Sequence, residues 1–402
     1  MTATHPDATR PEPALLDILD PQFRCCSPEV RAAAQANWWA RTPIGLAVLR
    51  YRECIALLRD RRLRHGSRDM LAAQGVTSGL FAQWLSSMLL NQEGEPHQRL
   101  RRLVSTAFTQ RRVDALRPFM RSTTHELIDT FAAAGRCEFM AEFADPYPAR
   151  VIAELLGIPG EEFDDFLGWA DDMGLGFSPV AGKELHRIEA ALTGLYECCD
   201  RLVARRRVNP GDDLISALIT AADDGGELTG EQLRILVSTL VFAGQDTTRN
   251  QLGLALATFT EHPQQWQLLA EHPELAGTAV EEVMRVSPAT PVIGRVAVED
   301  FTFQDLTIPA GTHLGLFVAV ANTEPETFGD APFDITAKRT AQLTFGGGIH
   351  YCLGTWLARI EMQEALPILA ARLPGVTTDG PVGWRPPVGI TGPTTLPLRW
   401  TT

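Results

Sequence analysis

One long helical segment constrains the fold more than any other part of the chain. Residues 229–261 carry a helical pattern, which at about 1.5 Å per residue would extend over about 50 Å. Apolar side chains lie on several faces of this segment, and Pro263 stops it. A helix that is apolar on several faces is buried, so we expect it to run through the centre of the protein.

The other predicted elements are mainly helices. Further helical patterns cover residues 95–108, 112–134 and 183–207. Short strand patterns stand near residue 45, at 292–304, from 313 onward and at the C-terminus. No linker rich in Gly, Ser or Pro divides the chain. We therefore expect a mainly α protein with small antiparallel β-sheets, folded as a single domain over residues 13–402 after a disordered tail at residues 1–12.

Charge and composition argue against several classes of function. The chain has 36 Lys and Arg against 49 Asp and Glu, a net charge of −13, whereas nucleic-acid binding requires clustered positive charge. The sequence shows no signal-peptide pattern, and no uncharged apolar run reaches the roughly 18 residues of a bilayer span. Seven cysteines without a Cys-x-x-Cys pair argue against a disulfide framework or a zinc site. We expect a cytoplasmic monomer that binds neither nucleic acid nor a membrane.

The most informative motif is a glycine loop followed by a cysteine, FGGGIHYCLGTWLAR at residues 345–359. Three consecutive glycines permit positive φ and let the backbone lie against a planar ligand. Cys352 stands where the sequence turns helical, and the free amides and the helix dipole favour its thiolate there. Such a thiolate can be a nucleophile or an iron ligand, and the iron ligand is favoured because no base or orienting group is recognisable. A buried structural cysteine in a turn is the remaining alternative.

This loop resembles the haem-binding signature of the cytochrome P-450 family in its soluble bacterial form. The matching positions are Phe345, Gly346, Gly348, His350, Cys352, Gly354, Leu357, Ala358 and Arg359. The resemblance extends over residues 20–400 and implies the triangular, helix-rich P-450 fold with haem b as the cofactor. It implies that Cys352 is the thiolate ligand of the iron, where an anionic sulfur favours O–O cleavage, and that Phe345 shields the sulfur from water.

A second motif, AGQDTT, lies in the middle of the long helix. Glycine within a helix costs about 1 kcal/mol relative to alanine. Ala243 and Gly244 therefore predict either a close approach to a flat ligand or a helix crossing at small residues. A following threonine can bond a carbonyl one turn back and open a groove. The resemblance implies that Asp246 relays protons, and that Thr247 bonds the bound dioxygen or the water that delivers them.

Basic side chains from separate segments are candidates for binding the two haem propionates. His97 and Arg101 are four residues apart and share a helical face, and Arg295 and His350 lie in later segments. Each alone fits a solvated charge, but their order along the chain resembles that of the family. The expected cofactor-binding set is therefore His97, Arg101, Ala243, Gly244, Arg295, Phe345, His350, Cys352 and Gly354.

A Glu-x-x-Arg pair, Glu282 and Arg285, has the spacing of one helical face and can form an ion pair. On the surface such a pair would contribute little. The resemblance implies instead a buried pair that stabilises the core beneath the haem.

Some positions depart from the family pattern. Gln245 and Gln342 stand where His is frequent, and Ala337 stands where Arg is frequent. Thr248 is expected to be structural. None of these departures touches Cys352.

The same resemblance implies that residues 67–91, 289–294 and 389–394 line the substrate cavity. Their apolar side chains predict an apolar or aromatic substrate of moderate size. The expected lining residues are Phe81, Trp84, Leu85, Val292, Ile293 and Ile390.

The resulting hypothesis is a monooxygenase that inserts one oxygen atom of dioxygen into a C–H or C=C bond, in natural-product or xenobiotic metabolism. The chain has no flavin or iron–sulfur motif, so the resemblance implies a ferredoxin and its reductase as electron donors. Their expected docking face is a basic cluster on the thiolate side, formed by Arg99, Arg102, Arg111, Arg112 and Arg359. The alternatives are haem-thiolate coupling, desaturation or peroxygenase chemistry, and a non-catalytic haem-binding sensor.

Overall fold

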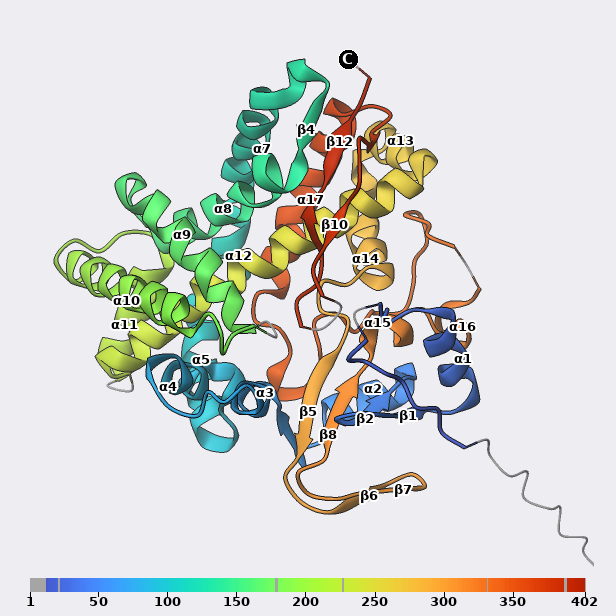
Figure 1. The fold of residues 1–402 in the computed structure, drawn as a ribbon. Helices are drawn as coiled ribbons and strands as arrows, with labels where there is room; N and C mark the ends of the chain where they lie inside the picture. The colour runs from blue at the N-terminus through green and yellow to red at the C-terminus, as the bar shows by residue number, and fades with distance from the viewer. Residues whose placement is uncertain are drawn as a thin grey trace, which may run out of the picture.

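The computed structural model describes residues 12–20, 22–177, 180–225, 228–330, 332–386 and 389–401. Long helices make up most of the molecule, and short strands lie between helices on either side (Figure 1). The predicted mainly α class with small antiparallel sheets is confirmed. The predicted disordered tail falls on residues 1–11, which lie outside the described residues, and on residue 12.

The helices account for most of the chain. In order they are α1 (Pro28–Ala36), α2 (Tyr51–Leu58), α3 (Ser67–Ala73), α4 (Leu80–Ser87), α5 (Gly94–Ala107), α6 (Gln110–Ala115), α7 (Arg117–Phe131), α8 (Pro146–Leu156), α9 (Phe163–Gly174), α10 (Leu185–Val208), α11 (Leu214–Gly225), α12 (Gly230–Glu261), α13 (Pro263–Glu271), α14 (Ala276–Val286), α15 (Val318–Ala321), α16 (Pro325–Phe328) and α17 (Thr355–Arg372). The helix predicted over 112–134 is divided into α6 and α7, because Pro118 in the first turn of α7 favours a helix start there.

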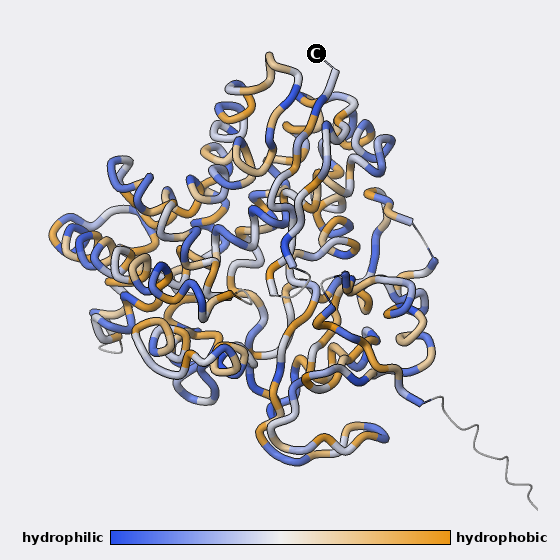
Figure 2. Tube along the Cα trace, viewed as in Figure 1, coloured by the Kyte–Doolittle hydropathy of each residue, from blue (hydrophilic) through white to orange (hydrophobic). Residues whose placement is uncertain are grey.

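The predicted central helix is confirmed as α12. Its start is fixed by a capping box, in which the Thr229 hydroxyl accepts the Gln232 amide and the Gln232 side chain accepts the Thr229 amide, each over 3.1 Å. It ends at Glu261, and Pro263 opens α13. The helix contacts α8, α9, α10, α14 and α17 (Figure 1). Hydrophobic and hydrophilic residues interleave along the helices, as in helices that bury one face (Figure 2).

The largest sheet has five strands and contains Arg295 in one of them. Its strand order is β1 (Trp39–Thr42), β2 (Gly45–Val48), β8 (His313–Leu316), β5 (Ile293–Ala297) and β3 (Leu63–His65). All its pairs are antiparallel except β2 with β8. The smaller sheets are β6 (Phe301–Phe303) with β7 (Leu306–Ile308), β10 (Gly383–Trp384) with β11 (Pro393–Thr395), and β4 (Arg136–Glu138) with β12 (Pro397–Arg399) and β9 (Thr377–Thr378). The register of β3 on β5 places His65 opposite Arg295.

The Glu282–Arg285 pair on α14 is buried. Arg285 Nη2 and Nε donate to Glu282 Oε1 and Oε2 over 2.7 and 2.8 Å. Arg339, which the sequence did not single out, donates to the same carboxylate over 2.9 Å. Arg339 lies two residues after Ala337, the position at which the family pattern led us to look for an arginine. The three charges join α14 to the segment that leads to the glycine loop.

Candidate functional site

The glycine loop brings Cys352 close to the N-terminus of α17. The Cys352 amide donates to the Phe345 carbonyl over 3.0 Å, and its carbonyl accepts the Thr355 hydroxyl over 2.7 Å. Gly348 has φ +68°, and a Cβ there would lie 2.6 Å from the Leu58 carbonyl oxygen. Glycine is therefore required at this position by both conformation and the close approach of α2.

Cys352 differs from the other six cysteines in being exposed. Many protein atoms nevertheless surround the thiol, and the resulting desolvation raises its pKa. Four groups oppose that rise: the Gly354 amide, the Thr355 hydroxyl, Arg101 and Arg359. The amides at the helix N-terminus thus favour the thiolate, as predicted, without outweighing desolvation. An accessible thiol in such an environment fits coordination of a positively charged metal centre, which deprotonates its ligand.

One narrow face of α12 is accessible in the middle of the buried helix. Ala243 is exposed and Thr247 half-buried, whereas Phe242 and Asp246 beside them are buried. The Thr247 hydroxyl donates to the Ala243 carbonyl over 3.0 Å, the bond to the preceding turn that the sequence suggested. An accessible strip of small residues on a buried helix fits a flat cofactor.

For Gly244 the structure favours the alternative explanation. A Cβ at this position would lie 2.9 Å from Cδ1 of Ile152 on α8. The glycine therefore allows α8 and α12 to cross closely, and its contact with the cofactor stays a prediction.

Asp246 and Thr248 both have protein partners. Asp246 is buried and forms ion pairs with Arg249 at 3.0 Å and Arg385 at 3.1 Å. The Thr248 hydroxyl donates over 3.1 Å to Glu361, a buried acid on α17 whose pKa is raised well above its usual value by burial. The contact is structural, as expected for Thr248.

Three of the four predicted propionate-binding residues, His97, Arg295 and His350, lie around one carboxylate, Glu93. His97 on α5 is buried, its ring centroid is 4.9 Å from that of His350, and both its ring nitrogens lack a hydrogen-bond partner among the described residues. Arg295 is also buried, which lowers its pKa to about 10. Burial would raise the pKa of Glu93, but His350, His97 and Arg295 lower it. Buried cationic and unpartnered groups of this kind fit the two carboxylates of haem.

Arg101, His350 and His65 make further contacts near the glycine loop. Arg101 Nη2 donates to the Tyr351 carbonyl over 2.6 Å, and His350 Nε2 lies 2.9 Å from Glu93 Oε1. His65, which sequence reasoning missed, lies with its ring centroid 6.4 Å from that of His350, and its pKa is lowered to about 3 by burial and by Arg295. Only the pairing of β3 with β5 brings it there, so the sequence carried no signal for it.

Arg359 contributes to the shielding of the loop. Its guanidinium lies 4.6 Å from the centroid of the Phe345 ring and pairs with Glu281. Arg112, from the same predicted docking cluster, pairs with Asp212 over 3.2 Å.

Three apolar residues of α4 are packed in the core. Phe81, Trp84 and Leu85 are buried, with Phe81 stacked on Trp84 at 5.5 Å between ring centroids. They pack against a second stack, Phe177 on Phe242 of α12, at 4.4 Å. The structure places these three residues in the core, which corrects the prediction, whereas the other three expected lining residues are half-buried.

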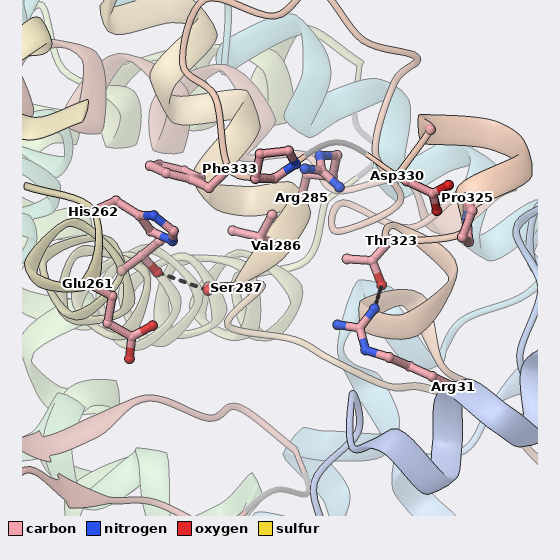
Figure 3. Close-up of a pocket in the computed structure, with 13 residues that line it drawn as sticks. Arg31, Glu261, His262, Arg285, Val286, Ser287, Thr323, Pro325, Asp330 and Phe333 are labelled. Carbon is pink, nitrogen blue, oxygen red and sulfur yellow. Dashed lines mark hydrogen bonds between the residues drawn. The ribbon is translucent and has the colours of Figure 1, made fainter. Parts of the chain in front are cut away.

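A pocket of about 410 Å³ lies away from these residues, beside the end of α12. Figure 3 shows Glu261 and His262 on one side of it, and Arg31, bonded to Thr323 over 3.0 Å, on the other. Within the described ranges, no three His, Cys, Asp or Glu residues are grouped to hold a metal ion. No helix in those ranges combines the length and apolarity needed to cross a membrane.

Comparisons with known proteins place these features in a family. The family model "Cytochrome P450" matches residues 179–370. The chain is 41% identical to luteothin monooxygenase of Streptomyces thioluteus over 99% of each chain. It is 36% identical to mycinamicin IV hydroxylase/epoxidase of Micromonospora griseorubida, over 88% of this chain and 89% of that one. The structure of cytochrome P450 CYP109Q5 from Chondromyces apiculatus superposes with a TM-score of 0.86 at 32% identity, covering 97% of this chain and 99% of that one.

Proposed function

The chain belongs to the cytochrome P450 family, and from that premise we propose how its residues serve a monooxygenase reaction with haem b. Haem, when bound, supplies an iron centre at which dioxygen is cleaved with two electrons and two protons. Cys352 would provide the thiolate ligand, and His97, Arg101, Arg295 and His350 would hold the propionates.

One observation carries this assignment: of the seven cysteines, Cys352 is the exposed one, in a loop that glycine shapes against α2. The Phe345 carbonyl accepts the Cys352 amide, and the guanidinium of Arg359 lies over the Phe345 ring; with haem bound, this ring would help to exclude water from the sulfur. The unpartnered nitrogens of His97 support carboxylate binding next to the same loop.

Thr247 and Asp246 are proposed to bring protons to the reacting oxygen. The Thr247 hydroxyl lies on the accessible face of α12, and because its hydrogen is donated to the Ala243 carbonyl, its oxygen can accept a hydrogen bond from a water molecule. Asp246 is the adjacent acid, and two guanidinium groups hold it in place. This role for an acid and a hydroxyl is general acid catalysis.

The substrate is proposed to be an apolar natural product of moderate size. Relatives named luteothin monooxygenase and mycinamicin IV hydroxylase/epoxidase support this class. Electrons are proposed to come from a ferredoxin and its reductase, docking near Arg99, Arg102, Arg111 and Arg112. Arg359 is committed to Glu281 and serves the loop instead.

The decisive experiment is the absorption spectrum of the reduced, carbon-monoxide-treated holoprotein. Thiolate ligation by Cys352 predicts a strongly red-shifted Soret band, and Cys352→Ser should abolish it. The control is Cys26→Ser, because Cys26 is half-buried and far from Cys352 in the sequence. This substitution should leave the band unchanged. A red-shifted band that survives Cys352→Ser would overturn the assignment of the ligand.

A further inference from the structure

Asp246 is the inner member of a charged network that extends toward the surface. Arg249, one turn along α12, has Nε 3.0 Å from Asp246 Oδ1. Its Nη1 donates to two other carboxylates, Asp145 Oδ1 over 3.1 Å and Asp171 Oδ1 over 2.9 Å. Arg385, which follows β10, binds both oxygens of Asp246. One guanidinium therefore joins the buried acid to an outer pair of acids.

The network runs from solvent to the interior. The side chains of Asp171 and Asp145 are 49% and 31% exposed, that of Arg249 is 15% exposed, and that of Asp246 is 6% exposed. Asp171 lies on α9 and Asp145 directly precedes α8, and both helices pack against α12 (Figure 1). The outer acids can thus exchange protons with water, while Asp246 is shielded from it.

The charges of the network leave room for one proton. Three carboxyl groups face two guanidinium groups, so the network has one surplus negative charge when all are ionised. Burial raises the pKa of Asp145 to about 6, with Asp171 and Glu138 raising it and Arg249 and Arg385 lowering it. Burial also raises the pKa of Asp171. The charges of Asp246 and Asp172 raise it further, whereas Arg249 and Arg385 lower it.

Unpartnered polar atoms lie beside the network. Gln245 is 2% exposed, its Nε2 is 3.5 Å from Asp171 Oδ1, and its Oε1 has no hydrogen-bond partner among the described residues. Asn250 donates to Asp246 Oδ1 over 3.2 Å, and its own Oδ1 is likewise unpartnered. The Gln245 oxygen, beside Asp171, can accept a hydrogen bond from a water molecule, whereas the Asn250 oxygen faces Gly392.

We propose that Asp145 and Asp171 are the solvent-side proton acceptors that resupply Asp246, with Arg249 as the positioning residue that links them. An outer carboxylate takes a proton from hydronium and leaves water outside. The proton then moves inward to Asp246, and the outer carboxylate returns to its ionised form. This inference rests on the proposed role of Asp246 and extends it to residues on α9 and at the start of α8.

The test compares Asp145→Asn with Asp171→Asn and the double variant in the reconstituted holoenzyme. The double variant should form about tenfold less product per NAD(P)H, release more peroxide and show a larger solvent deuterium isotope effect. In the parent enzyme the rate of product formation should fall as pH rises through about 6, because protonated Asp145 is the proton donor. This dependence on pH should disappear in Asp145→Asn. Asp145→Glu should restore it.

Asp172→Asn is the matched control, since Asp172 neighbours Asp171 on α9 but pairs with Arg187. It should leave the coupling and the isotope effect unchanged, and it should keep the fall in rate near pH 6, because Asp172 is not among the groups that shift the pKa of Asp145. The proposal fails if the double variant keeps the parent's coupling and pH profile, or if Asp172→Asn loses as much. The carbon-monoxide spectrum separates this failure from failure of the proposed function, because it reports ligation by Cys352 and does not depend on proton supply.

Discussion

Replacing Glu282 by Gln should destabilise the protein by about 3–5 kcal/mol, because it leaves two guanidinium groups without their counter-charge in the interior. Glu282 is 2% exposed in its side chain, and its partners Arg285 and Arg339 are 5% and 13% exposed. The carboxylate accepts three guanidinium hydrogen bonds of 2.7–2.9 Å and the Asp334 amide over 3.1 Å. An amide has the same shape but cannot accept all four bonds or supply the charge.

The same pair makes stability depend on pH. Burial would raise the pKa of Glu282, but Arg285, the Asp334 amide and Arg339 lower it below its ordinary value of 4.5. Since the folded pKa lies below the unfolded one, the stabilisation is present above about pH 4.5 and is lost as pH falls through the folded value. Glu282→Gln should therefore lose this part of the acid sensitivity.

Urea unfolding of the holoprotein at pH 7 and pH 4 measures both effects. Glu281→Gln is the control, since Glu281 is the adjacent residue but is 38% exposed and pairs with Arg359 on the surface. It should cost less than about 1 kcal/mol. Equal unfolding midpoints for the two variants would refute the argument that burial decides the contribution of this ion pair.

Two further substitutions test the site. Thr247→Ala should lower product per NAD(P)H about tenfold and release peroxide, because the hydroxyl on the accessible face is lost. Thr239→Ala removes the same kind of bond to the preceding turn (2.6 Å) and should leave product per NAD(P)H unchanged. An equal loss of product in the two variants would contradict the proton role of Thr247. Gly348→Ala should cost about 1–3 kcal/mol and weaken haem retention, because φ is +68° and the Leu58 carbonyl is close. Gly311 also has a positive φ, but a Cβ there would meet no atom within 4 Å. If Gly311→Ala lowers the unfolding midpoint as much as Gly348→Ala, the close approach of the Leu58 carbonyl is unimportant.

Local patterns were sufficient for the elements and for the centre of the site. The helical pattern over residues 229–261 and Pro263 after it are local features, so the bounds of α12 were predicted to within one residue. The requirement for glycine before Cys352 was also visible in the sequence. The Thr247 bond to Ala243 followed from helix geometry alone.

Contacts between distant segments could not be predicted in the same way. Arg385 lies 139 positions from Asp246, and His65 meets Arg295 only because β3 pairs with β5. The small size of Gly244 predicted either a cofactor contact or a helix crossing, and the sequence could not name Ile152 on α8 as the residue that approaches it.

The sequence by itself determined the helical class, the family resemblance and the candidate ligand Cys352, because these depend on periodicity and on spacing within short segments. Tertiary structure alone decided that Arg339 joins the Glu282–Arg285 pair, that Phe81 and Trp84 belong to the core, and that Asp246 is held by two arginines. The physical reason is that burial and charge pairing depend on which elements pack together, and a repeating pattern specifies which face is buried without specifying its partner.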